Sequence, residues 1–169
     1  MDVGGIDPHG VEVRAFVLQG FRHRESDLHA QFAANATVDR RDPDALFAAV
    51  IVLDQFSRNL YRGDARAYAN DPAARRLANE AIEQGFDFRM TPVQRLFLYL
   101  PFEHSENAED QARCVALMES LGNDSWTRSA TAHKAVIDRF GRFPHRNALL
   151  GRESTPAELA ALQRPGNSF

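Results

Sequence analysis

Five hydrogen-bonding side chains lie close together in one short stretch of the sequence, LDQFSRNLYRG, at residues 53–63. An α-helix turns by about 100° per residue, so these side chains fall on one continuous arc, with Leu53, Phe56 and Leu60 on the opposite side. The preceding segment, AAVIV, is apolar all round, and we therefore expect the arc to be partly buried. Buried charges need partners, and Asp54 and Arg58 can pair with each other at the i, i+4 spacing. The five residues of the arc are Asp54, Gln55, Arg58, Asn59 and Arg62.

Two later stretches offer partners for this polar arc. In PFEHSE, residues 101–106, the ring of Pro101 predicts that the preceding helix ends or kinks there, which would deliver Glu103 and His104 from a buried helix end. In RFGRFPHRN, residues 139–147, a glycine is followed by a polar loop. Residues 134–152 contain five Lys or Arg against one Asp, a local net charge of +4 in an acidic protein. The polar residues of that loop are Arg142, His145, Arg146 and Asn147.

Several arginines, held in place by acids and amides, suit the recognition of a carboxylate or a phosphate, because a guanidinium can bind either group through two parallel hydrogen bonds. The leading interpretation is therefore a protein that binds a small anionic molecule or a peptide carboxylate in an arginine-rich internal polar site. The predicted ligand-binding residues are Asp54, Gln55, Arg58, Asn59, Arg62, Arg142, His145, Arg146 and Asn147.

Two other interpretations stay open. The first is an enzyme, a hydrolase or lyase acting on an anionic metabolite, with Glu103 and His104 as general acid and base. Neither Ser57 nor Ser105 lies in a Gly-x-Ser-x-Gly elbow, so the sequence singles out no nucleophile. The second is a helical scaffold for a protein partner, in which the polar network is purely structural and ties helix ends together.

The sequence predicts neither a metal nor an organic cofactor. Glu103, His104, Glu106 and His145 could supply ligands to a metal, but their spacing matches no recognised ligand motif. Cys114 is the only cysteine, which excludes an intrachain disulfide, and we expect it to be a small buried side chain.

Composition narrows the class of protein. The chain has 169 residues, 44% hydrophobic and 25% charged, which is ordinary for a soluble globular domain. A net charge of −3 argues against a general nucleic-acid binder. No apolar run approaches the ~20 residues needed to span a bilayer, and the first residues lack the features of a signal peptide. We therefore expect a cytoplasmic protein without a membrane partner, and the oligomeric state stays open.

Helix start and stop signals recur along the whole chain. Asp42, Asp71, Thr91 and Thr155 each precede a proline, as N-cap residues do, and Thr155 also begins a capping box. Gly85, Gly122 and Gly141 each follow a segment with helical apolar spacing. These signals predict an all-α fold, a single-domain helical-hairpin bundle of seven or eight helices over residues 11–169, after a flexible N-terminus at residues 1–10. Residues 46–53 and 96–100 are apolar on every side and should belong to central helices.

The three segments LDQFSRNLYRG, LFLYLPFEHSE and RFGRFPHRN together resemble the signature segments of a family of bacterial proteins that is classed as a domain of unknown function. The resemblance spans residues 42–162 and implies a tetratricopeptide-like helical fold in the bacterial cytoplasm. It implies no activity, substrate or cofactor. Members of that family usually begin with tryptophan-containing aromatic helices, whereas residues 13–32 here contain no tryptophan. If those aromatic residues close a pocket, we expect the pocket of this protein to be altered or more open.

Overall fold

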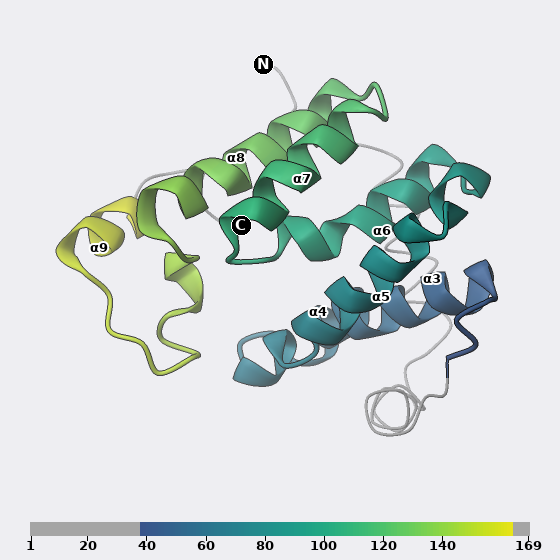
Figure 1. The fold of residues 1–169 in the computed structure, drawn as a ribbon. Coiled ribbons are helices and arrows are strands. Elements are labelled where there is room, and N and C mark those ends of the chain that lie inside the picture. The colour runs from purple at the N-terminus through teal and green to yellow at the C-terminus, as the bar shows by residue number, and fades with distance from the viewer. Residues whose placement is uncertain (1–37, 164–169) are drawn as a thin grey trace, which may run out of the picture.

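Helices account for all the regular secondary structure of residues 38–163, the part of the chain that the computed structural model describes (Figure 1). This all-α architecture confirms the predicted fold class. Counted as continuous rods, the described residues form six helices, slightly fewer than the seven or eight predicted for the chain. The α-helices are α3 (Pro43–Ile51), α4 (Ser57–Leu60), α5 (Asp71–Glu83), α6 (Pro92–Glu103), α7 (Ala108–Glu119), α8 (Asp124–Phe140) and α9 (Pro156–Leu162).

Shorter helical turns join these helices. A π-helical turn, η1 (Val52–Phe56), connects α3 and α4 without a break, so residues 43–60 form one continuous rod. The remaining turns are 3₁₀ helices: η2 (Ala65–Tyr68), η3 (Phe86–Arg89) and η4 (Pro144–Arg146).

Side-chain caps fix most of the helix starts, as the sequence predicts. Asp42 accepts a hydrogen bond from Asp44 N, and Thr91 and Thr155 each form a complete capping box. The prediction for Asp71 is wrong: the N-cap of α5 is Asn70, and Asp71 is the first residue inside the helix. The side chain of Asp71 is therefore available for contacts elsewhere.

Glycines end two of the helical segments where the sequence places stop signals. Gly141 follows α8 with φ at 69° and Gly85 follows α5 with φ at 71°, both in the left-handed region that a residue with a side chain adopts at a cost. The turn at Gly141 redirects the chain into the loop that carries Arg146.

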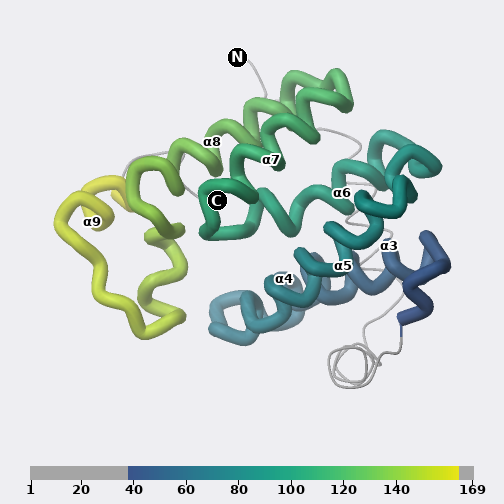
Figure 2. The backbone as a smooth tube through the Cα atoms, viewed as in Figure 1, coloured from purple at the N-terminus to yellow at the C-terminus, as the bar shows by residue number. Residues whose placement is uncertain are grey.

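Helix α6 is the central element of the fold. It packs against α3, α5, α7 and α8, and its buried Leu98, Tyr99 and Phe102 join a core that includes Leu46 and Val50 of α3. Helices α7 and α8 lie side by side as an antiparallel hairpin, and α3 and α5 pack together (Figure 2). The central position predicted for residues 96–100 is thus confirmed.

The helix does not end at Pro101, which was one of the two outcomes predicted there. Helix α6 continues past this buried proline to Glu103, and His104 is its C-cap residue, with its backbone N–H directed to Leu100 O. The two residues beyond Pro101 still follow the helix, which places Glu103 and His104 on different sides of α6.

Two predictions concern residues outside the described part of the chain. These are the flexible N-terminus at residues 1–10 and the consequence of the divergent segment at residues 13–32. Within residues 38–163, no helix combines the length and the apolar character that crossing a membrane requires.

Candidate functional site

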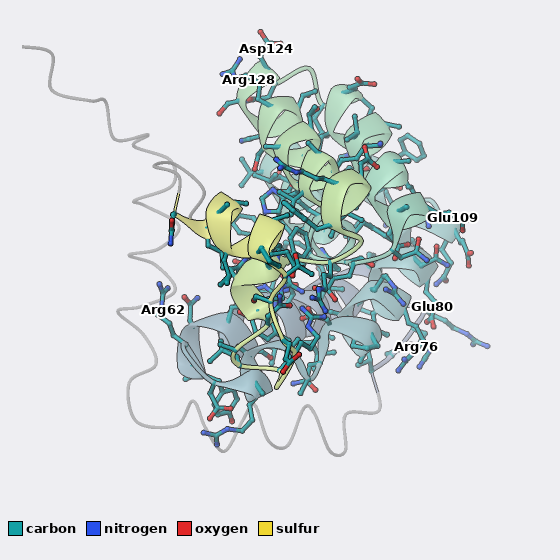
Figure 3. All side chains as sticks on the ribbon, turned by 90° about the vertical axis from the view of Figure 1, so that its left-hand side faces the viewer. Arg62, Arg76, Glu80, Glu109, Asp124 and Arg128 are labelled. Carbon is teal, nitrogen blue, oxygen red and sulfur yellow. The ribbon has the colours of Figure 1, made fainter. Side chains whose placement is uncertain are left out.

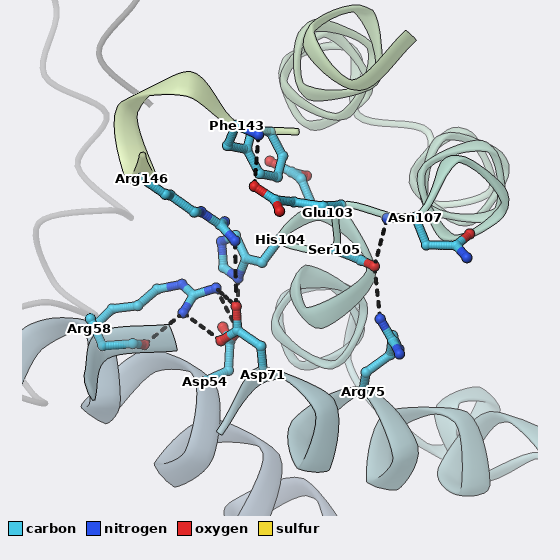
Figure 4. Close-up of polar contacts among 12 residues, drawn as sticks. Asp54, Arg58, Asp71, Arg75, Glu103, His104, Ser105, Asn107, Phe143 and Arg146 are labelled. Carbon is cyan, nitrogen blue, oxygen red and sulfur yellow. Dashed lines mark hydrogen bonds and ion pairs between the residues drawn. The ribbon is translucent and has the colours of Figure 1, made fainter. Parts of the chain in front are cut away.

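The segments LDQFSRNLYRG and LFLYLPFEHSE meet at a buried carboxylate. Asp54 lies in the π-helical turn η1 and is only 1% exposed. Its Oδ1 lies 2.7 Å from Nδ1 of His104 (Figure 4). Its Oδ2 accepts a 2.6 Å hydrogen bond from Gln55 Nε2. Arg58 Nη2 lies 3.6 Å from the same Oδ1. Residues fifty positions apart in the sequence are thus joined through one carboxylate.

The charge of Asp54 is stabilised by these neighbours. Burial alone favours the neutral acid, but the contact with His104 and the positive charge of Arg58 outweigh it and hold the pKa of Asp54 below its ordinary value of 3.8. Asp54 is therefore an ionised acceptor, and the proton of the short contact belongs to Nδ1 of His104.

Two of the five residues predicted for the polar arc lie apart from the other three. Asn59 and Arg62 are exposed, and their mutual hydrogen bond spans 3.5 Å. Figure 3 shows Arg62 extending outward from the molecule. The prediction assumed α-helical geometry throughout, whereas the wider π turn changes the angular spacing and the rod ends at Leu60. Asn59 and Arg62 therefore lie outside the polar cluster.

Asp71, which the sequence analysis assigned to a helix cap, is the second central carboxylate. It receives two hydrogen bonds from Arg58, from Nη1 at 2.8 Å and from Nη2 at 3.0 Å. Its Oδ2 also lies 3.6 Å from Nη1 of Arg146, in the third signature segment. Asp71 therefore links the first segment to the third, and all three segments converge on one polar cluster (Figure 4).

Arg146 is the most unusual member of this cluster. Its side chain is buried, with the residue 6% exposed, and its guanidinium lies 4.6 Å from the ring centroid of Tyr68 and 4.4 Å from that of Phe143. Within residues 38–163 its buried Nε has no hydrogen-bond partner. Burial, and then the positive charge of Arg58, lower the pKa of Arg146. The pKa of Arg58 is instead raised, because Asp54 and Asp71 offset the cost of burying its charge.

A cleft of about 270 Å³ opens beside these residues. It lies between the start of α5, the end of α6 and the loop that carries Arg146. Its polar wall includes both cations and carboxylates, whereas alanines, a proline and a leucine supply the remainder. The lining residues are Ala65, Tyr68, Ala69, Asp71, Pro72, Arg75, His104, Ser105, Glu106, Arg146 and Leu150.

Other charged residues at the cleft are already matched. Arg75 Nη1 lies 2.9 Å from Ser105 Oγ and 3.1 Å from Asp110 Oδ2. Glu106 receives two hydrogen bonds from Arg152, at 2.7 and 2.9 Å, as well as one from the backbone N–H of Phe143. These pairs fix the walls of the cleft and leave Arg146 as the least satisfied of its cations.

Glu103 and His104 do not form the acid/base pair that the sequence suggested. Glu103 is 3% exposed and points toward α8, where its Oε1 accepts a 2.9 Å hydrogen bond from Ser129 Oγ and lies 3.1 Å from His133 Nδ1. Burial is the main reason that the pKa of His133 is lowered. Neighbours in sequence on a helix point in directions about 100° apart, so the carboxylate partner of His104 is Asp54 instead.

The remaining predicted residues surround the cluster without lining the cleft. Arg142 binds both carboxylate oxygens of Glu158 in α9, and the buried Asn147 donates a hydrogen bond to Ser154 Oγ. His145 lies against the ring of Phe143, and burial together with the nearby Arg146 lowers its pKa to about 4. Arg142 and Asn147 therefore organise the C-terminal loop, and His145 is a neutral neighbour of the cluster.

Several residues of the cleft were missed by sequence reasoning. Tyr68, Asp71 and Arg75 follow one another at helical spacings of three and four, and this was the available signal. Within the described residues, no group of three or more His, Cys, Asp or Glu side chains is placed to hold a metal ion.

The chain belongs to a family of bacterial proteins of unknown function, DUF924, whose pattern matches residues 12–166. This confirms the predicted membership of a bacterial family of unknown function. A solved structure of similar fold is that of the protein of unknown function ATU0120 from Agrobacterium tumefaciens. It is 42% identical over 83% of this chain and 80% of that chain, with a TM-score of 0.77. None of the curated proteins matches this chain.

Proposed function

We propose that this protein binds a small anionic ligand, or the carboxylate of a peptide, in the cleft beside Arg146. The observation that carries the proposal is the state of Arg146 itself. Its guanidinium is held between two aromatic rings, lines a cleft, and has one ion-pair partner at 3.6 Å and an Nε without a hydrogen bond among the described residues. An incompletely satisfied buried cation of this kind gains stability when an anion supplies the missing contacts.

The chemistry of the cleft favours a carboxylate or a phosphate as the bound group. A planar guanidinium matches either anion through two parallel hydrogen bonds, and stacking between Tyr68 and Phe143 holds its orientation before the ligand arrives. Asp54, Gln55 and Arg58 do not reach the ligand in this proposal. They fix Asp71 and His104, which line the cleft.

Calorimetry with inorganic phosphate and with acetate tests this proposal directly. Arg146→Lys keeps a positive charge but loses the two-pronged geometry, and Arg146→Met removes the charge. We expect both variants to weaken binding at least tenfold, equivalent to about 1.4 kcal/mol. Arg62→Met is the matched control, because Arg62 is exposed and lies outside the cluster.

The same experiment separates the binding proposal from a purely structural network. If Arg146→Lys remains folded and binds phosphate as tightly as the unaltered protein, the cleft is not an anion site. If neither anion binds the unaltered protein at all, the polar cluster serves the fold alone. The scaffold alternative requires an exposed apolar groove. Among the exposed large apolar residues in the described part of the chain, only Leu159 and Leu162 share an element, α9, and the others are Phe88, Val93 and Leu150.

We also propose that the protein acts in the cytoplasm. The support is its single cysteine, Cys114, which is buried as a free thiol, in keeping with a reducing compartment.

A further inference from the structure

The contact between Asp54 and His104 has the form of a positioned general base. Asp54 is 1% exposed and lies 2.7 Å from Nδ1 of His104, whereas the His104 side chain is 16% exposed and lines the cleft. A buried carboxylate that orients a solvent-facing imidazole is the arrangement by which many enzymes prepare a histidine to accept a proton.

The chemistry of the two groups fixes where the proton lies on the ring. An ionised carboxylate can only accept a hydrogen bond, so Nδ1 of His104 must carry the proton. In the neutral ring this leaves the lone pair on Nε2. Among residues 38–163, no side chain or backbone group forms a hydrogen bond with Nε2, so the lone pair is available to a ligand in the cleft.

The neighbouring nucleophiles are not prepared for covalent chemistry. Ser105 Oγ donates its hydrogen bond to Asp110 at 2.6 Å and lies outside the hydrogen-bond partners of His104. Cys114 is fully buried, and burial together with Glu103 raises the pKa of its thiol. Among the described residues, the cleft therefore combines a base with an anion-holding group, and that combination suits proton transfer.

We propose that His104 is a general base that removes a proton from a carbon acid whose carboxylate is bound by Arg146. The inference rests on the anion site proposed above and adds a reaction to it. In a 2-oxo acid, Nε2 takes a proton from the carbon next to the ketone. The electron pair of that C–H bond forms the carbon–carbon double bond of an enolate, and the ketone oxygen takes the negative charge. Return of a proton from the imidazolium restores the acid.

Asp54 acts in this step as a positioning residue, since it reaches the ligand only through His104. Arg58 contacts the same oxygen of Asp54, and His133 is near enough to interact with the imidazole electrostatically. The charged residues that line the cleft together with His104 are Asp71, Arg75, Glu106 and Arg146. Asp54 is the only one of these groups that contacts Nδ1 within hydrogen-bond distance in the described part of the chain.

The first test measures the protonation of each ring nitrogen by ¹⁵N NMR at pH 7.5. We expect Nδ1 of His104 to be protonated and Nε2 to be unprotonated. In Asp54→Asn the side-chain amide can donate to Nδ1, so the proton should move to Nε2. A proton on Nε2 in the unaltered protein would overturn the proposal.

The second test follows hydrogen–deuterium exchange at C3 of pyruvate in D₂O by NMR. Pyruvate is a small carboxylate with an acidified C–H that the cleft can accommodate. We expect exchange at least tenfold faster with the unaltered protein than with His104→Gln, and a loss of at least tenfold in Asp54→Asn. Lys134→Gln is the control, because Lys134 pairs with Asp138 on the exposed face of α8, and it should leave the rate unchanged.

Pyruvate binding, measured by calorimetry, separates failure of this inference from failure of the anion site. If pyruvate binds through Arg146 but exchanges no faster than with His104→Gln, the general base is ruled out and the anion site stands. If phosphate or acetate binds but pyruvate does not, the general base is ruled out and the anion site stands, whereas both are ruled out if none of the three binds to the unaltered protein.

Discussion

Asp54 links three other polar side chains of the cluster. It contacts Gln55, Arg58 and His104, and its removal would leave all three without this negatively charged partner. The cost of removing one partner from a buried charged network is large because the remaining groups keep their desolvation without compensation.

We therefore expect Asp54→Ala to lower the free energy of unfolding by about 3–5 kcal/mol. Urea denaturation followed by circular dichroism measures the change. Asp138→Ala is the control, because Asp138 pairs with Lys134 on the exposed face of α8 and its loss should cost less than about 1 kcal/mol. Equal effects of the two substitutions would show that the network around Asp54 contributes little to stability.

Some neighbours in the polar cluster could be predicted from the sequence, whereas others could not. Asp54, Arg58, His104 and Arg146 were predicted to come together, and the structure places them in one cluster. Their roles toward a ligand stay a prediction. Asp71 was misread because an Asp-Pro pair fits a helix cap equally well, and only the position of Arg58 in space decides between the two uses.

At the level of elements, the sequence defined helix starts well because caps are local. Thr91 and Thr155 bond to amides three residues away, so the pattern contains the whole interaction. The π-helical turn at Val52–Phe56 was not predicted, since the sequence contains no local signal for it. The direction of Glu103 was not predicted either, because it depends on a tertiary contact with Ser129 of α8.

The short helix α9 depends on one carboxylate for its attachment. Glu158 accepts hydrogen bonds from Arg142 and from the backbone N–H of Thr155, and these contacts lower its pKa from 4.5 to about 2. Because the pKa of Glu158 is lower in the folded protein than in the unfolded chain, its ionised carboxylate stabilises the folded state at pH values above the pKa of the unfolded chain. This contribution should be complete above pH 4.5 and lost as the pH falls toward 2.

We expect Glu158→Gln to remove that pH dependence and to increase amide hydrogen exchange in α9 at neutral pH. Exchange measured by mass spectrometry between pH 7 and pH 3, with rates corrected for intrinsic chemistry, tests both points. Glu153→Gln is the control, since only its backbone carbonyl contacts Arg142. An α9 that is equally protected in both variants would mean that apolar packing alone holds the helix.

At the scale of the whole molecule, ligand binding should raise the stability of the fold. The cleft is built from the start of α5, the end of α6 and the loop after α8, so an anion that bridges them binds the native state only. Ligand at a hundred times its Kd adds about 2.7 kcal/mol, which corresponds to roughly 5–10 °C in Tm for a chain of this size.

A thermal melt with increasing phosphate tests this expectation. The Tm of the unaltered protein should rise with phosphate concentration, whereas that of Arg146→Met should rise no more than it does with sodium chloride at equal ionic strength. A parallel rise in both proteins would point to a general salt effect.

The irregular turn in the first rod has a consequence for attempts to engineer this protein. A π turn arises when a helix holds one residue more than regular winding accommodates, and it is less favourable than the α-helix on either side. Deleting one residue of the turn would let the rod wind as a regular α-helix, and the helices on either side would keep nearly the same orientation, because the π turn already accommodates the extra residue by wider winding. Asp54 lies within the turn, so we expect it to move relative to His104. Selection for thermostability alone would therefore favour proteins that have lost the contact between Asp54 and His104.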